Sequence, residues 1–214
     1  MKRKRCASSA RGMWGGLVLG LALALQVGVA RADVVVRNAS EGDDAFMARV
    51  LGPKSGDLAQ KVVRSTEIAG GKLTLIGFVN ADDNNLVGHL LIETSPGHYD
   101  HVTFPSCEEE GGAPELMAVF FARTVNGGGR NLAVLCSWEQ GGPVTNGMFY
   151  GAQFYRLEEK GTQLGVEPVA DLNKKFKTSD LVYNEHGKWR QGPKARFRTV
   201  AEVKKLLTKM GLKQ

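Results

Sequence analysis

The chain has 214 residues with 28 basic and 22 acidic side chains, and its formal net charge is +6. Six basic residues and no acidic residue lie in the first 32 positions, so the remainder carries 22 of each sign and is formally neutral. Global charge therefore gives no argument for binding to nucleic acid, and no nucleic-acid partner is expected.

The first 32 residues have the layout of a secretory signal peptide. Residues 2–5 are basic, residues 17–25 are an apolar run, and residues 30–32 place small side chains around a cleavage point. This order predicts a signal peptide over residues 1–32. No later segment is long and apolar enough to span a bilayer, so no transmembrane segment is expected after cleavage.

We expect an exported protein, periplasmic or secreted, that starts near Asp33 and forms one globular domain over residues 33–214. Cys6 would be lost with the signal peptide, which leaves Cys107 and Cys136. Two cysteines in an oxidising compartment predict one disulfide bond. The alternative is a reactive or metal-binding thiol pair, although these two cysteines lack the C-x-x-C spacing of a redox pair.

The predicted elements begin with a short strand over residues 33–37 and two short helices. The first helix is capped by Asp43 or Asp44 and stops at residues 52–53, where glycine precedes proline. The second helix is expected to start at Asp57. The residues expected to face inward on these helices are Phe46, Met47, Val50, Leu51, Leu58, Val62 and Val63.

Six apolar runs then predict a mainly antiparallel sheet of about six strands between residues 73 and 157. Turn-forming residues join the first run to the second and the fourth run to the fifth, which predicts two hairpins. Several runs are apolar at consecutive positions, so we expect helices or another sheet to cover both faces. In chain order the runs are 73–79, 86–92, 99–104, 116–122, 132–138 and 148–157.

The chain is then expected to return to helix. Residues 164–177 are ambiguous, with Leu172 and Phe176 as anchors. Thr199 and Glu202 form a capping box that opens a C-terminal amphipathic helix. Its apolar stripe contains Val203, Leu206, Leu207 and Met210, with the two leucines as the main buried anchors, and Gly211 is its stop. The predicted fold class is α+β: the sheet is flanked by N-terminal helices and by this C-terminal helix.

Charge is divided unevenly along the chain. Residues 33–171 carry 10 basic and 19 acidic side chains, whereas residues 172–214 carry 12 basic and 3 acidic ones. The basic region over residues 172–214 either faces the acidic body or offers a surface to an anionic partner such as a membrane headgroup, a glycan or an acidic protein.

The histidines are the candidate metal ligands. His98 and His101 point to opposite faces of a strand, so both reach one ion only if the chain turns near residues 96–97. With His89, or with a carboxylate from residues 108–110, they could supply three ligands for zinc. The alternative is that all three are ordinary surface or cross-strand polar residues, because their spacing is not that of H-E-x-x-H.

Other patterns have ordinary explanations beside functional ones. Residues 82–85 offer oxygen ligands for calcium but fit a hairpin turn. Residues 127–130 could hold an anion but fit a flexible turn, and residues 108–110 fit a solvated acidic loop. Aromatic strand residues could line a ligand groove or fill the core: Trp138, Phe149, Tyr150, Phe154 and Tyr155.

No catalytic pattern stands out, since the chain has no G-x-S-x-G elbow and no other nucleophile motif. We therefore expect no catalytic residue and no cofactor. The leading interpretation is a non-enzymatic exported protein, partner-binding or inhibitor-like, whose partner is an envelope or extracellular protein. The first alternative is a metal-dependent hydrolase using His89, His98 and His101. The second is a structural envelope protein whose basic surface over residues 172–214 docks on an anionic surface.

Overall fold

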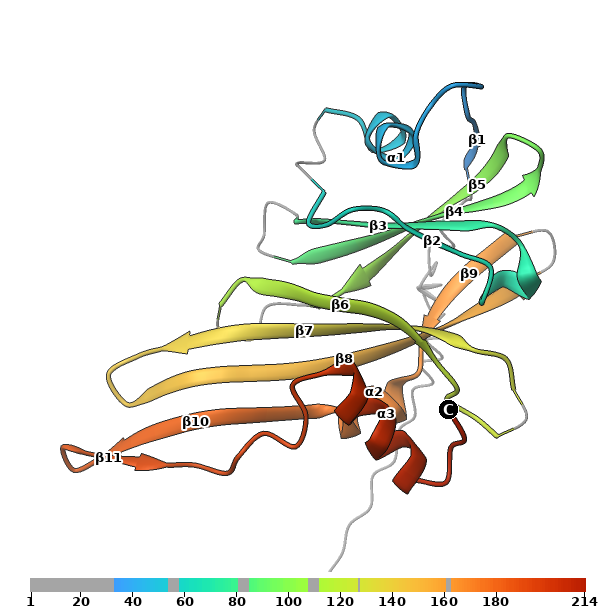
Figure 1. Ribbon diagram of the computed structural model, residues 1–214. Helices are drawn as coiled ribbons and strands as arrows, with labels where there is room; N and C mark the ends of the chain where they lie inside the picture. The colour runs from blue at the N-terminus through green and yellow to red at the C-terminus, as the bar shows by residue number, and fades with distance from the viewer. Residues whose placement is uncertain (1–32, 54–57, 81–84, 108–111, 127, 161–162) are drawn as a thin grey trace, which may run out of the picture.

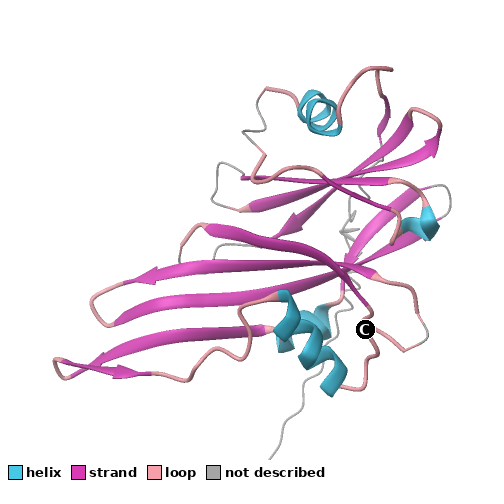
Figure 2. Cartoon of the chain, in the orientation of Figure 1, coloured by secondary structure: helices cyan, strands magenta, loops and turns pink. Residues whose placement is uncertain are grey.

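Two antiparallel sheets lie face to face, and short helices cover their outer faces (Figure 1). The computed structural model describes residues 33–53, 58–80, 85–107, 112–126, 128–160 and 163–214, so the expected signal peptide lies outside the described residues. Figure 2 shows the helices on opposite sides of the two sheets. The layers are, in order, α1 (Asp43–Leu51), sheet A, sheet B, and α2 (Ala170–Lys175) with α3 (Val200–Lys209).

Strand pairing defines the two sheets. Sheet A contains, in spatial order, β1 (Asp33–Val36), β5 (His98–Ser106), β4 (Leu86–Ser95), β3 (Thr74–Asn80) and β2 (Val63–Ser65). Sheet B contains β11 (Lys188–Gln191), β10 (Lys177–Glu185), β8 (Thr145–Lys160), β7 (Asn131–Gly141) and β6 (Pro114–Ala122), and β9 (Gln163–Pro168) also pairs with β8. Within the described part of the chain, no helix is both long and apolar enough to cross a membrane.

The inner faces of the sheets form the main core, in which Phe104 of β5 is central. Its ring lies over Gly88 of β4, where a Cβ atom would come within 2.2 Å of the ring. The ring then meets Tyr155 of sheet B edge-on, with 4.8 Å between centroids. Glycine is required at position 88 because any side chain there would push Phe104 out of this contact.

The predicted disulfide between Cys107 and Cys136 is confirmed, and it joins the two sheets. Cys107 follows β5, Cys136 lies on the inner face of β7, and their Cα atoms are 6.4 Å apart. The backbone N–H of Cys107 also donates to Gln153 Oε1 of β8 at 3.2 Å. The end of β5 is therefore attached to two strands of sheet B.

Helices bury the outer faces of both sheets. On sheet A, α1 inserts Phe46 and Met47, and Met47 fits against Gly77, where a Cβ atom would lie 3.0 Å from its side chain. On sheet B, α3 packs Val203 and Leu207 against a chain of aromatic rings. Those rings are Phe120, Phe154, Phe176 and Phe197.

The expectation of one sheet of about six strands is wrong, although its antiparallel character is confirmed. The first three apolar runs became β3, β4 and β5 of sheet A, and the last three became β6, β7 and β8 of sheet B. The inner face of each sheet meets the other sheet and the outer face meets helices. Consecutive apolar residues therefore indicated two covered faces correctly but could not indicate what covers them.

The N-terminal predictions hold in part. The strand over residues 33–37 is confirmed as β1, and α1 is confirmed with Gly42 as its N-cap instead of an aspartate. Asp44 Oδ1 instead accepts from the backbone N–H of Val62 at 2.8 Å. The second helix is wrong where it is described, because β2 begins at Val63 and pairs with β3; its expected start, Asp57, lies outside the described residues.

The expected return to helix after residue 164 is also wrong for most of its length. The ambiguous segment 164–177 contains β9 and α2, and the next residues form the β10–β11 hairpin. Both anchors are confirmed, since Leu172 and Phe176 are buried. Side chains of β10 alternate only weakly between apolar and polar, so the sequence of this segment does not indicate a strand.

The C-terminal helix is confirmed as α3, including the Thr199–Glu202 capping box. Its burial differs from the expectation in one respect: Val203 and Leu207 are fully buried, whereas Leu206 is half-buried and Met210 is 45% exposed.

The different burial of Leu206 and Leu207 leads to a prediction about stability. Leu207→Ala should lower the free energy of unfolding by about 2–5 kcal/mol because it opens a cavity against sheet B. Leu206→Ala should cost less, and Lys205→Ala, on the exposed face of the same helix, should stay within about 0.5 kcal/mol. Urea unfolding of the three variants checks this, and equal losses in all three would contradict the orientation of α3.

Candidate functional site

A side cavity forms where β9 and β10 pair with the same edge of β8. β10 pairs with the first part of β8 and β9 with the last part, while β7 occupies the other edge. Between them, α2 takes the place of a strand. The backbone of Phe154 bonds to Val169 N–H at 2.9 Å and to the Asn173 side chain at 2.8 Å. This substitution satisfies the backbone of β8 but leaves a gap beside the inner face of sheet B.

The cavity at this gap has a volume of about 510 Å³. Its floor is the inner face of β7 and β8, its roof is the end of β5, and its sides are β9, α2 and β10. Most of the lining is apolar, with polar side chains contributed by β8, α2 and β10. The floor and roof include Trp138, Phe149, Gly151, Gln153, Tyr155, Phe104 and Pro105; the sides include Val166, Pro168, Ala170, Asn173, Lys174, Lys177, Thr178 and Ser179.

The floor is held in place by one glycine and one amide. Gly151 lies under the Trp138 indole, since a Cβ atom there would be 3.0 Å from the ring. Gln153 Oε1 accepts from Cys107 N–H and also from the Tyr155 hydroxyl. Because Tyr155 contacts Phe104 of the roof, these interactions fix roof and floor relative to each other.

Positive charge lies on one side of the cavity. Lys174 of α2 and Lys177 of β10 line it and are both exposed. Lys174 makes no ion pair with any described residue. The described lining includes no carboxylate, imidazole or thiol, so it offers apolar contact, hydrogen bonds and cationic groups to a ligand.

The aromatic residues singled out from the sequence divide between cavity and core. Trp138, Phe149, Tyr150 and Tyr155 line the cavity, and Phe154 is buried under α2 and α3. Sequence reasoning missed the roof and the α2 side chains. The one local signal was glycine inside the aromatic run 149–155, which typically marks close approach of another group.

Two of the three candidate metal ligands come together, on the outer face of sheet A and away from the cavity. His89 Nδ1 and His101 Nε2 lie 3.1 Å apart, so one ring nitrogen donates to the other. His98 is on the opposite face of β5, where its Nδ1 donates to the Pro96 carbonyl at 3.2 Å. His98 does not join this pair, and no group of three or more histidine, cysteine or acidic side chains among the described residues could hold a metal ion. The zinc site of His89, His98 and His101 stays a prediction.

The remaining sequence candidates contribute little. Residues 82–84 and 108–110 lie outside the described residues. In the glycine-rich turn, Arg130 forms an ion pair with Glu67, which occupies its guanidinium with a carboxylate of this chain.

Comparison with protein-family models, curated proteins and solved structures finds no match for this chain. The functional argument therefore depends on the site itself.

The histidine pair makes a pH prediction. Burial, and then the neighbouring His101, lowers the pKa of His89 from its ordinary 6.5 to about 4. Below pH 6.5 the unfolded chain takes up a proton that the folded chain does not, so stability should fall by up to about 3 kcal/mol between pH 6.5 and pH 4. Urea unfolding across this range should show a weaker pH dependence in His89→Gln, with the exposed His98→Gln as control. An unchanged dependence in His89→Gln would contradict the prediction.

Proposed function

We propose that this chain is a non-enzymatic, exported binding protein that holds the apolar part of an amphipathic anion in the side cavity. The observation that carries the proposal is a cavity of about 510 Å³ with aromatic walls and lysines on one side. Cavities of this size and lining are typical of small-molecule sites.

The apolar part of the cavity favours a ligand with a hydrocarbon body. Aromatic side chains from both sheets form the floor and the roof. A hydrocarbon chain placed between them would therefore be removed from water on all sides. Each methylene group removed from water contributes about 0.8 kcal/mol, which is roughly a fourfold change in Kd. In a series of ligands that differ only in hydrocarbon length, Kd should therefore fall by a constant factor for each added methylene group.

The lysines favour an anionic head group. Lys174 is exposed at the cavity and has no ion-pair partner among the described residues. A carboxylate, phosphate or sulfate head could bind its ammonium group while the hydrocarbon stays inside. Asn173, Thr178 and Ser179 add hydrogen-bonding side chains along the same cavity.

Two further features support a binding role over a catalytic one, and export over residence in the cytoplasm. The described lining offers no carboxylate, imidazole or thiol for acid–base or nucleophilic chemistry. The disulfide is compatible with an oxidising compartment. A protein partner for the same molecule, as the sequence suggested, stays a prediction beside this one.

A chain-length titration tests the proposal. In Trp189→Phe, Trp138 is the only tryptophan after the signal peptide and it lines the cavity, so its fluorescence reports occupancy. Saturated fatty acids from eight to fourteen carbons should bind more tightly with length, by about fifteenfold for each two carbons until the cavity is full. No change in Trp138 fluorescence with any of them would overturn the proposal.

Matched variants locate the binding. Ala170→Trp, at an exposed lining position in the first turn of α2, should abolish binding by filling the cavity, whereas Ala201→Trp, in the first turn of α3, should not. Lys174→Glu should weaken the binding of dodecanoate about fivefold or more and leave the binding of dodecanol unchanged. Lys175→Glu on the same helix is the control. If a variant and its control changed the affinity equally in either comparison, the ligand would bind elsewhere on the protein.

A further inference from the structure

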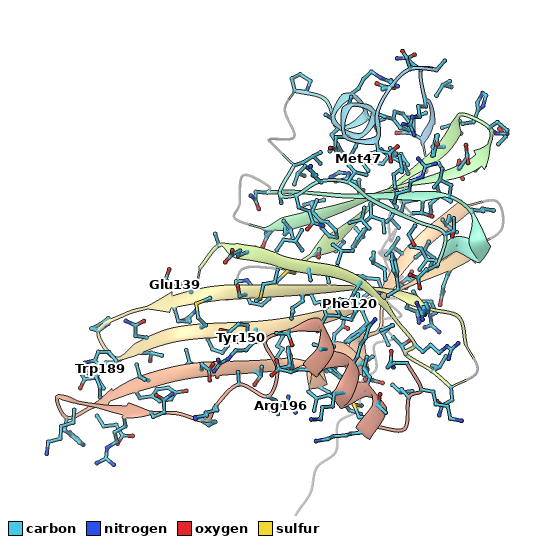
Figure 3. The ribbon with its side chains drawn as sticks, viewed as in Figure 1. Met47, Phe120, Glu139, Tyr150, Trp189 and Arg196 are labelled. Atoms are coloured by element: carbon cyan, nitrogen blue, oxygen red, sulfur yellow. A yellow bond between two sulfur atoms is a disulfide. The ribbon has the colours of Figure 1, made fainter. Side chains whose placement is uncertain are left out.

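The β10–β11 hairpin extends sheet B well past sheet A (Figures 1 and 3). Among the described strands, β11 pairs only with β10, in the register that sets Asn184 opposite Trp189. The β7–β8 turn reaches the same end of the sheet, because Asn184 N–H donates to the Val144 carbonyl at 2.9 Å. These two segments form one end surface, which we call the hairpin tip.

Large apolar side chains are exposed at the hairpin tip. Trp189 is 51% exposed, Val144 is 62% exposed and Tyr183 is 37% exposed. Figure 3 shows Trp189 at the far end of sheet B, away from the core between the two sheets. Single exposed apolar residues are ordinary, but the register places Trp189 on one face of the hairpin and Tyr183 on the other. Apolar side chains on both faces of a protruding tip indicate a partner that surrounds the tip, as an apolar or interfacial medium does.

The hairpin tip and the residues that follow it are also basic. Between residues 183 and 194 the charged groups are Lys188, Arg190, Lys194 and one acid, Glu185, which pairs with Arg190 at 3.0 Å. Lys188 and Lys194 are exposed and make no ion pair with a described residue.

The other acids of the basic region over residues 172–214 do not cancel this charge. Asp180 pairs with Arg198, and Glu202 caps α3, so the region's other two acids are also engaged by groups of the same region. The positive charge of the region is therefore not cancelled by its own acids. The share at the tip comes from Lys188, Arg190 and Lys194, because α3 lies away from the tip (Figure 1).

We propose that the hairpin tip docks on an anionic lipid surface. Tryptophan and tyrosine favour the headgroup level of a bilayer, and lysine and arginine are attracted to anionic headgroups. The choice of a lipid surface over an acidic protein rests on the proposed function, because an amphipathic anion partitions into membranes. β10 connects the two sites: Lys177 and Ser179 line the cavity, and Tyr183 lies at the tip of the same strand.

Vesicle flotation tests the docking with protein purified from the exported fraction. Vesicles of phosphatidylglycerol and phosphatidylcholine should bind the protein, added salt should weaken the binding, and vesicles of phosphatidylcholine alone should bind much less. Trp189→Ala should weaken the partition about tenfold, and Lys188→Glu about fivefold or more. The controls are Val36→Ala, an exposed valine on β1, and Lys205→Glu on α3, and both should bind as the unmodified protein does.

The direct readout is Trp189 itself. Its emission should shift to the blue on anionic vesicles and should be quenched by lipids brominated near the headgroup end of the acyl chain. No binding to anionic vesicles, equal losses in the variants and their controls, or self-association through the tip in place of vesicle binding would each overturn the docking. Trp189→Ala should keep its affinity for dodecanoate by calorimetry, so a failure of docking and a failure of the cavity proposal are distinguishable.

Discussion

The attachment of the end of β5 to the inner face of sheet B is the constraint on which the rest of the structure depends. At this point Cys107 is bonded to Cys136 of β7, and its backbone N–H donates to Gln153 of β8. Phe104, three residues earlier, fills the space between Gly88 and Tyr155. Covalent, polar and aromatic contacts thus fix the distance between the sheets at the point where the side cavity needs a rigid roof. Loosening any one of them would change the shape of the cavity as well as the stability of the fold.

The length of β8 is the second feature that determines the structure. β7 pairs along one edge of β8, but no single strand covers the whole of the other edge. β10 and β9 share that edge, and α2 supplies the hydrogen bonds in between through Val169 and Asn173. The same arrangement leaves the gap that becomes the cavity and directs β10 away from the body toward the hairpin tip. One local irregularity in strand pairing therefore produces both features to which we assign a function.

Much of the fold could be predicted from local sequence, and its assembly could not. The hairpin of β3 and β4, the capping box of α3 and the disulfide each depend on residues close in sequence or on a single possible pairing. The division into two sheets depends on contacts between distant segments, and consecutive apolar residues are equally compatible with a helix or a sheet as cover. The cavity has the same origin: the aromatic residues of β7 and β8 could be named, but Phe104 and Lys174 reach them only through the tertiary fold. Strand alternation alone predicts that His98 and His101 point to opposite faces of β5, and the structure agrees, whereas the contact between His89 and His101 depends on the pairing register of β4 and β5.

The most direct test of the central claim is where an apolar ligand lies on the protein. NMR spectra recorded during a titration with dodecanoate should show the largest shifts at the Trp138 indole N–H and at the methyl groups of Val166, Ala170 and Thr178, which surround the cavity from four different elements. Met47 of α1 and Val35 of β1, which belong to the cluster on the far face of sheet A, should not shift. Shifts confined to α1 or to the edge of sheet A, or no saturable shift at all, would contradict the account.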